Sequence, residues 1–242
     1  MQTLVVLPTF NEAENIDEVL RRVRAALPDA TVLIVDDGSP DGTADIAEAL
    51  SDELGPLEVL RRAKKSGLGS AYREGFRIGI QRGFEALVEM DSDLSHDPAA
   101  LPSLLAPLDD DADIGLVVGS RYIPGGSIPH WSLHRRLLSE WGNRYASLML
   151  GVKVRDSTSG FRAYRAAAVA KIDLEQIRAD GYGFQIEMAY VIARSGWRVV
   201  ERPIAFVDRV RGTSKMSSHI VVEALLLVTW WSLRDRLFKR GR

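Results

Sequence analysis

Short apolar runs alternate with helical patterns over the first 120 residues, and this alternation constrains the fold more than any other feature. Runs typical of strands lie at residues 4–7, 32–35, 57–60, 84–90 and 114–118. The first helical pattern between them places Ile16, Val19, Leu20 and Val23 on one stripe, and Asn11 is expected to cap that helix. Strands separated by helices of this length predict an α/β fold with a mainly parallel sheet wrapped by helices.

The strand exits are where a binding site is expected. In open parallel sheets, ligands bind beyond the carboxyl ends of the strands. The segments that follow the predicted strands are residues 8–10, 36–37, 61–69, 91–93 and 119–121. We expect them to meet at one edge of the sheet.

The second half of the sequence is less regular. A glycine- and proline-containing loop at residues 122–133 precedes a predicted helix at 134–150, and a polar stretch follows at 155–162. Beyond it, the sequence predicts a helix at 184–194, strands at 198–201 and 205–207, and a basic loop at 208–218. No repeat or linker is apparent, so we expect one catalytic domain, 1–215, with residues 216–242 appended.

The final helix, residues 220–238, is apolar around most of its girth and ends in Trp230, Trp231 and a run of basic side chains. Tryptophan beside basic residues is typical of a membrane interface, and a core helix with a charged tail is the equal alternative. The apolar stretch is shorter than the roughly 20 residues that a spanning helix needs. Residues 216–242 are therefore either part of the same domain or an amphipathic, interfacial helix.

Charge is distributed unevenly along the chain. Residues 1–60 hold thirteen acidic and three basic side chains, whereas residues 194–242 hold eleven basic and four acidic ones. A basic C-terminal region suits an anionic ligand or membrane surface, although a solvated charged face is equally common. The net charge of −2 and the lack of aromatics within the basic loops argue against nucleic-acid binding. The absence of cysteine excludes disulfides and thiolate metal sites.

The acidic strand exits suggest a metal and a nucleotide. Asp91 and Asp93 follow an apolar strand two residues apart, so both carboxylates can reach one Mg²⁺ or Mn²⁺ ion. Ser95 and His96 follow as further ligands or as parts of a helix cap. At the second strand exit, we expect Asp37 to face a ligand and Asp41 to face the backbone of a turn.

Basic residues supply candidate phosphate contacts. The loop with Lys64, Lys65, Gly67 and Gly69 is like a phosphate cradle, but GxGxxG and GKS/T patterns are absent, which argues against dinucleotide oxidoreductases and P-loop NTPases. Further basic residues that suit phosphate oxygens lie in predicted loops or at element ends, at Arg121, Arg135, Arg209 and Lys215.

Five motifs occur in an order that resembles a known family. They are Pro8-Thr9-Phe10-Asn11-Glu12, Val35-Asp36-Asp37-Gly38-Ser39, Asp91-Ser92-Asp93-Leu94-Ser95-His96, Gly119-Ser120-Arg121-Tyr122 and Asp156-Ser157-Thr158-Ser159-Gly160-Phe161. The chain resembles the inverting family-2 glycosyltransferases of GT-A fold, and within them the polyprenol (dolichol) phosphate mannose synthases. The resemblance runs from residue 3 to about residue 220.

The resemblance implies a metal-dependent enzyme that transfers mannose from GDP-mannose to a polyprenyl phosphate with inversion. It implies a metal site of Asp91, Asp93 and Ser95, with Mg²⁺ or Mn²⁺, and a catalytic set of Asp91, Asp93 and Arg121. The acceptor contacts that it implies are Arg121, Arg135 and Ser139. The donor contacts that it implies are Pro8, Phe10, Glu12, Val35, Asp37, Met90, Ser92, Arg121, Arg209 and Lys215.

Two of these positions depart from the family pattern. Relatives usually have Tyr where Phe10 stands and often Gln where Ser95 stands. The alternatives are a family-2 transferase that uses UDP-glucose, UDP-GlcNAc or a saccharide acceptor, and a non-catalytic nucleotide-sugar binding module. We expect peripheral attachment at the cytoplasmic face of a membrane, directly or through an integral membrane partner protein.

Overall fold

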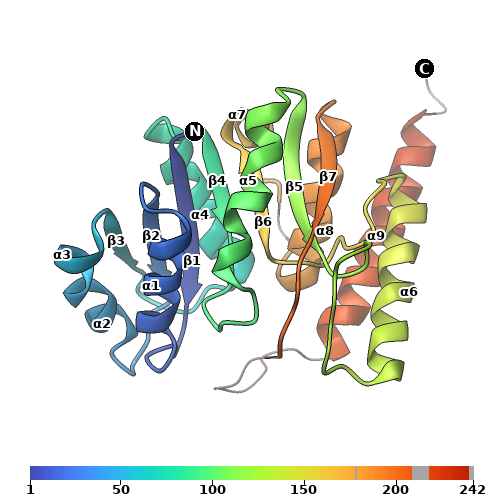
Figure 1. The fold of residues 1–242 in the computed structure, drawn as a ribbon. Helices are drawn as coiled ribbons and strands as arrows, with labels where there is room; N and C mark the ends of the chain where they lie inside the picture. The colour runs from blue at the N-terminus through green and yellow to red at the C-terminus, as the bar shows by residue number, and fades with distance from the viewer. Residues whose placement is uncertain (178, 209–217, 240–242) are drawn as a thin grey trace.

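The described part of the chain forms one seven-stranded sheet (Figure 1). The computed structural model describes residues 1–177, 179–208 and 218–239, with the side chains of the last helix from 224 to 234. The strand order is β3-β2-β1-β4-β6-β5-β7. The strands are β1 (Thr3–Thr9), β2 (Thr31–Asp36), β3 (Leu57–Arg61), β4 (Ala86–Glu89), β5 (Ile114–Ser120), β6 (Arg162–Arg165) and β7 (Arg198–Pro203).

Helices cover both faces of the sheet, as the sequence predicts. One face packs against α1 (Ile16–Ala26), α2 (Thr43–Ala49) and α5 (Leu101–Asp110). The other face packs against α4 (Leu68–Gln81), α7 (Ala166–Ala170) and α8 (Gly181–Arg194). The remaining helical elements are α3 (Ser51–Leu54), η1 (Pro98–Ala100), α6 (Leu133–Leu150) and α9 (Ser218–Lys239).

Strands β1, β2 and β5 are largely apolar because both of their faces are covered. Leu4 and Val6 point into the core beneath α4, whereas Val5 and Leu7 point into the core beneath α1. This alternation follows from the period of two residues in a strand. Because β1, β2, β3 and β4 are parallel, their carboxyl ends share one edge.

Strand β6 was not predicted from the sequence. It runs antiparallel between β4 and β5, whereas β5 and β7 pair in parallel. The strand is only four residues long and begins and ends with arginine, so it lacks an apolar run. Arg162 is nonetheless fully buried, because its guanidinium donates to the carbonyl oxygens of Ser157, Ser159 and Gln185.

Two local expectations were wrong. The strand expected at 205–207 is reduced to isolated bridges, which join Ala205 to Ser127 and Phe206 to His96. Asn11 does not cap α1, which begins at Ile16 after a turn. Asn11 has a φ of 58°, and its backbone N–H donates to the Ser39 hydroxyl. Between β4 and β5 lies α5, for which no residue range was predicted.

Helices α6 and α9 lie side by side beyond β7 (Figure 1). The ring of Trp231 on α9 stacks on Tyr190 of α8 at 6.2 Å, and the hydroxyls of Tyr145 and Thr229 are 2.7 Å apart. The final helix therefore packs on the domain, while Leu226 and Trp230 on its other side stay exposed. The division at residue 215 remains a prediction. Among the described helices, none combines the length and hydropathy required to traverse a bilayer.

Candidate active site

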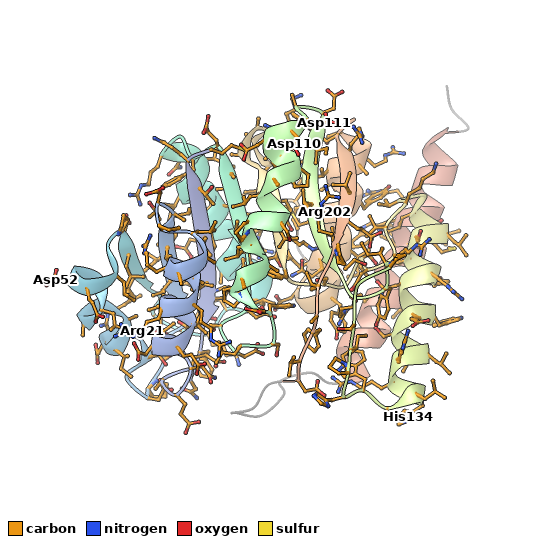
Figure 2. All side chains as sticks on the ribbon, viewed as in Figure 1. Arg21, Asp52, Asp110, Asp111, His134 and Arg202 are labelled. Carbon is orange, nitrogen blue, oxygen red and sulfur yellow. The ribbon has the colours of Figure 1, made fainter. Side chains whose placement is uncertain are left out.

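A cavity of about 410 Å³ opens at the carboxyl edge of the sheet, where the strand exits were expected to meet. In Figure 2, His134 lies at this edge, and Asp110 and Asp111 lie at the opposite one. Several of the predicted donor and metal residues line the cavity together: Pro8, Phe10, Glu12, Asp37, Asp91, Ser92 and Asp93.

The structure does not bring every predicted residue to this cavity. The side chains of Val35 and Met90 are packed in the two cores beneath it. Ser95 is buried on the far side of the acidic loop, where it lines a second cavity of about 440 Å³. Arg209 and Lys215 lie outside the described residues.

Hydrogen bonds join the loops that follow β1 and β2 beside the cavity. Asp36 accepts hydrogen bonds from the hydroxyls of Thr9, at 2.8 Å, and Ser39, at 2.6 Å. Asp41 accepts from the backbone N–H groups of Ala13, at 3.0 Å, and Thr43, at 3.1 Å. Burial opposes ionisation of Asp41, but these hydrogen bonds prevail and lower its pKa. Asp41 therefore faces the backbone, as predicted.

The basic loop 62–67 closes one side of the cavity. The ammonium group of Lys65 lies 4.4 Å from the centre of the Phe10 ring. The Asp37 carboxylate is 2.9 Å from Arg62 Nε and accepts a hydrogen bond from Ser66 N–H at 3.1 Å. Asp37 thus positions the loop through these two contacts, and its side chain also lines the cavity. An aromatic face, a carboxylate and an ammonium group at one place suit a nucleoside diphosphate.

The two acids after β4 have different surroundings. Asp91 accepts a long hydrogen bond, 3.3 Å, from the buried hydroxyl of Tyr72. Asp93 accepts from the backbone N–H of Ser95 at 3.0 Å, in a tight turn where Leu94 has a φ of 61°. The hydroxyl of Ser92, between them, donates to the Pro8 carbonyl oxygen at 2.9 Å. Both carboxylates still line the cavity.

These acids fit a divalent cation. Within the described residues, no three side chains from His, Asp and Glu gather as a complete ligand set. Two carboxylates suffice for Mg²⁺, which keeps several waters and takes further oxygens from a bound diphosphate. The cavity around Asp91 and Asp93 has room for such a ligand.

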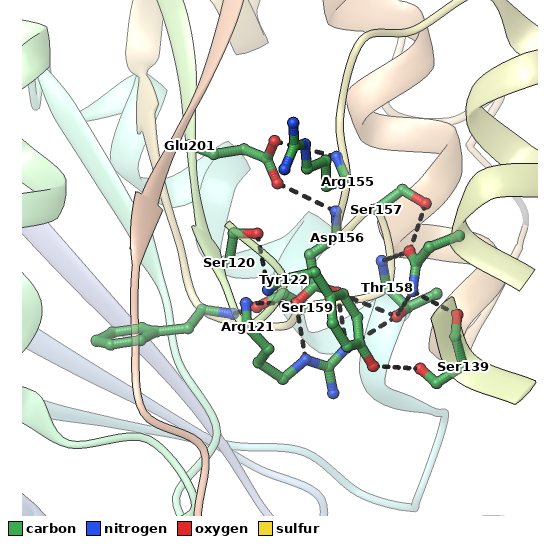
Figure 3. A network of polar contacts seen from close by, with 12 residues as sticks. Ser120, Arg121, Tyr122, Ser139, Arg155, Asp156, Ser157, Thr158, Ser159 and Glu201 are labelled. Carbon is green, nitrogen blue, oxygen red and sulfur yellow. Dashed lines mark hydrogen bonds and ion pairs between the residues drawn. The ribbon is translucent and has the colours of Figure 1, made fainter. Parts of the chain in front are cut away.

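Arg121, at the exit of β5, is held by a buried network (Figure 3). Its Nε and Nη2 donate to the two carboxylate oxygens of Asp156, each at 2.7 Å, and Nη2 also donates to Thr158 at 3.0 Å. Asp156 is fully buried. Burial opposes the positive charge of Arg121, but the Asp156 carboxylate prevails and raises its pKa. Two of its nitrogens therefore already have an anionic partner.

The predicted acceptor residues lie at the start of α6, near the Arg121 network. The Tyr122 hydroxyl donates to Ser139 at 2.7 Å, as Figure 3 shows. Arg135 is half-exposed and stacks on the Trp131 ring, with its guanidinium carbon 3.9 Å from the ring centre. Its Nη1 is 3.2 Å from the Asp208 carboxylate. An exposed arginine beside a serine can bind a second anion next to the cavity.

His96 does not have the properties of a general acid. Its ring is buried between Phe161, at 5.0 Å, and Phe206, at 5.3 Å. Burial lowers its pKa to about 4, so the imidazole is neutral at pH 7. The cap of the following helical turn is Asp97, whose carboxylate accepts a hydrogen bond from the backbone N–H of Ala99 in η1.

Three cavity residues with polar side chains lie outside the sequence motifs: Asp180, Tyr182 and Gln185. Asp180 accepts a hydrogen bond from the backbone N–H of Gly69 at 2.6 Å, which joins the segment before α8 to the first turn of α4. Residues 180–183 directly precede the helix predicted at 184–194. A helix that starts at the ligand-binding edge of the sheet could have indicated that these residues line the site. Gly160 leaves space beside Asp91, because an added Cβ would lie 3.5 Å from Asp91 Oδ2.

A buried carboxyl group supports the floor of the cavity. Glu89, the last residue of β4, accepts hydrogen bonds from the Tyr164 hydroxyl, at 2.7 Å, and from the Gln185 amide. Burial raises the pKa of Glu89. Gln185 Oε1 has no hydrogen-bond partner among the described residues. This network positions Gln185, which lines the cavity.

Comparison with known sequences gives consistent results. A family model described as glycosyl transferase family 2 matches residues 4–173. An undecaprenyl-phosphate mannosyltransferase of Micrococcus luteus is 48% identical over 236 residues, covering 98% of this chain and 96% of the relative. A polyprenol monophosphomannose synthase of Mycolicibacterium smegmatis is 45% identical over 241 residues, covering 98% and 89%.

Solved structures share the fold at lower identity. Glucosyl-3-phosphoglycerate synthase of Mycobacterium tuberculosis, in complex with phosphoglyceric acid, has a TM-score of 0.69 at 19% identity, covering 94% of this chain and 78% of that one. A mannosyltransferase of Pyrobaculum calidifontis, in complex with GDP-Man and Mn²⁺, has a TM-score of 0.61 at 16% identity, covering 96% and 72%.

Proposed function

The chain belongs to glycosyl transferase family 2, and on that premise we propose that it transfers mannose from GDP-mannose to a polyprenyl monophosphate with inversion. The products are polyprenyl-phosphate mannose and GDP. The expected GT-A architecture agrees with the mostly parallel, seven-stranded sheet. Relatives named for this type of reaction are 48% and 45% identical over nearly the whole chain.

One observation of the structure carries the proposal. Asp91 and Asp93 line the same cavity as Phe10 and Asp37, so a nucleotide and its diphosphate can lie along one continuous surface. Arg135 and Ser139 offer a second anion site nearby, outside this cavity. A donor diphosphate and an acceptor phosphate can therefore bind to separate groups of the protein.

We propose that Asp91 and Asp93 hold a Mg²⁺ or Mn²⁺ ion, with Ser95 as the third ligand of the family pattern. Such an ion would neutralise negative charge on the diphosphate leaving group. The related mannosyltransferase that was solved with GDP-Man and Mn²⁺ supports this assignment. Ser95 would have to act through its backbone turn or a water, because its side chain is buried away from the cavity.

The reaction requires positioning more than proton transfer. A phosphate monoester has a second pKa near 6, so the acceptor is largely a dianion at pH 7. One of its oxygens attacks the anomeric carbon, the bond to GDP breaks, and the configuration inverts. No general base is needed, which agrees with the packing of the buried His96 ring between Phe161 and Phe206. The protein binds both anions, and Arg135 and Ser139 orient the attacking phosphate.

We propose that α6 and α9 attach the protein to the cytoplasmic face of a membrane. Their outer sides expose large apolar residues, including Leu133 (71% exposed), Trp141 (54%) and Trp230 (62%). Exposed tryptophan and leucine beside arginine are typical of interfacial helices. Arg135 lies on the same helix, so the proposed phosphate contact would sit beside the bilayer. An integral membrane partner remains a prediction.

The test is a transfer assay. The purified chain is incubated with radiolabelled GDP-mannose, a short polyprenyl phosphate and Mn²⁺ or Mg²⁺, and label is counted in the lipid fraction, with EDTA as the control. We expect label in the lipid fraction and its loss with EDTA. Preferred transfer from UDP-glucose or UDP-GlcNAc would contradict the donor assignment. Binding of GDP-mannose without transfer would favour a non-catalytic module.

A further inference from the structure

Trp131, in the loop before α6, contacts both arginines of the proposed acceptor site. The centre of its ring is 3.9 Å from the guanidinium carbon of Arg135 and 5.4 Å from that of Arg121. An arginine that stacks on an aromatic face gains cation–π attraction and has its plane fixed by the ring.

The polar atom of the same side chain is also engaged. The indole N–H donates to Asp208 Oδ1 at 2.9 Å, and Asp208 in turn receives Arg135 Nη1 at 3.2 Å. Trp131, Asp208 and Arg135 thus form a closed set of three contacts. The ring of Phe206 packs edge-on against Trp131 at 5.8 Å and anchors this set to the body of the domain.

This arrangement leaves part of Arg135 available to a ligand. Only Nη1 of its guanidinium is bonded to a described residue, so Nε and Nη2 have no such hydrogen bond. Arg121 is fixed differently, because Asp156 holds two of its nitrogens. Each arginine therefore has one carboxylate, and both contact one ring, which limits how far apart the two cations can move.

We propose that Trp131 is a positioning residue of the acceptor site, which orients Arg135 by stacking and, through its N–H, holds the Asp208 carboxylate that fixes Nη1. The ligand is the phosphate group of the lipid acceptor, so this inference rests on the proposed function. A long arginine side chain that is half-exposed would otherwise sample many rotamers, and restricting them lowers the entropic cost of binding phosphate.

The test measures acceptor and donor constants separately, with a short, water-dispersible polyprenyl phosphate so that membrane attachment does not enter. Trp131→Leu removes both the ring and the N–H, and should raise the acceptor KM on the order of tenfold. Trp131→Phe keeps a ring and should have a smaller effect. The KM for GDP-mannose and the Kd for GDP should stay within about twofold. Trp131 and its partners Arg135 and Asp208 do not line the donor cavity.

A double-variant cycle separates positioning from a general loss of structure. If Trp131 acts through Arg135, Trp131→Leu should add little to the acceptor KM of Arg135→Ala. Trp197→Phe is the matched control for Trp131→Phe, because Trp197 also stacks with a cation, Lys171 at 4.7 Å, but precedes β7 and does not line the cavity. It should leave both KM values unchanged.

The outcomes distinguish this inference from the function on which it rests. If the unaltered protein transfers no mannose to polyprenyl phosphate, the proposed function fails. If it does transfer mannose, an unchanged acceptor KM in Trp131→Leu overturns the role of Trp131. Additive effects in the double variant, or an equal rise in both KM values, overturn it as well.

Discussion

The carboxylate of Asp156 forms a bidentate ion pair with the guanidinium of Arg121, and both residues are buried. The sequence analysis placed Arg121 among the residues that touch phosphate. Its ion pair with Asp156 indicates instead that much of its side chain serves to fix the β5 exit against the segment before β6. Any contact between Arg121 and a substrate must use the part of its guanidinium that Asp156 does not bind.

Breaking this pair should destabilise the protein strongly. Asp156→Asn would leave the Arg121 charge buried without its counter-charge, and we expect a loss of about 3–5 kcal/mol in the free energy of unfolding. Urea denaturation measures this loss. Glu175→Gln, which breaks the exposed pair with Arg77, should cost less than about 1 kcal/mol. Similar costs for both variants would contradict the structural role of Asp156.

Removal of the first acid after β4 should abolish transfer. Asp91→Asn keeps the shape of the side chain but weakens its hold on a divalent cation, so we expect activity to fall by at least about a hundredfold. Transfer assays over a range of Mn²⁺ concentrations measure it. Asp110→Asn, at the opposite edge of the sheet in Figure 2, is the control and should retain activity. Full activity of Asp91→Asn would remove the metal assignment.

Arg135→Gln should impair use of the lipid phosphate without weakening nucleotide binding. A charge-assisted contact contributes about 1.5–3 kcal/mol, so the acceptor KM should rise roughly tenfold or more. Calorimetric titration with GDP should give an unchanged Kd. Arg136→Gln is the matched control, because Arg136 is exposed next in the chain and pairs with Glu140. An equal loss of acceptor and nucleotide binding argues against an acceptor role.

Gly160→Ala should lower activity while the fold persists. The added methyl would lie 3.5 Å from Asp91 Oδ2 and 3.6 Å from Gln185 Nε2, which is ordinary contact and requires no rearrangement. It would nevertheless fill space beside the proposed cation, and we expect kcat/KM to fall about tenfold or more. Gly142→Ala, which meets nothing within 4 Å, should keep its activity. Unchanged kcat/KM in Gly160→Ala would mean that substrate does not approach Gly160 in the cavity.

Asp41 should make stability depend on acid pH. Because its pKa is lowered in the folded protein, the ionised form stabilises the fold at pH values above the ordinary value of 3.8. This contribution is lost as the pH falls through the folded pKa. We expect Asp41→Asn to lower the free energy of unfolding at pH 7, and the difference from the unaltered protein to shrink below pH 3.8. Thermal melts at several pH values measure it, and a constant difference would contradict this account.

The first half of the fold was predictable because each strand there is an apolar run and each exit carries a polar motif. The spacing of the apolar residues between 16 and 23 was sufficient to predict α1. The exits of β1, β2 and β4 meet at one cavity, as expected. The turn before α1 was not predictable. It depends on the hydroxyls of Ser39 and Thr43, beyond the next strand, which accept hydrogen bonds from the backbone N–H groups of Asn11 and Glu12.

The second half was harder because its order depends on distant partners. Arg162 would be an unfavourable strand residue if three backbone carbonyls did not converge on it. The partner of Arg121 lies 35 residues along the chain, and Trp131 meets Asp208 across 77. Side chains at such separations have no local pattern, so sequence reasoning identified the arginines without their orientation.

The insertion of β6 sets the distance between the exits of β4 and β5. Adjacent strands are about 4.8 Å apart, so these exits are separated by roughly two such spacings, with the amino end of β6 between them. Without β6, the two strands would be adjacent and their exits one spacing apart. In the proposed reaction, the inserted strand would therefore hold an anion at the β4 exit apart from a second anion beyond the β5 exit.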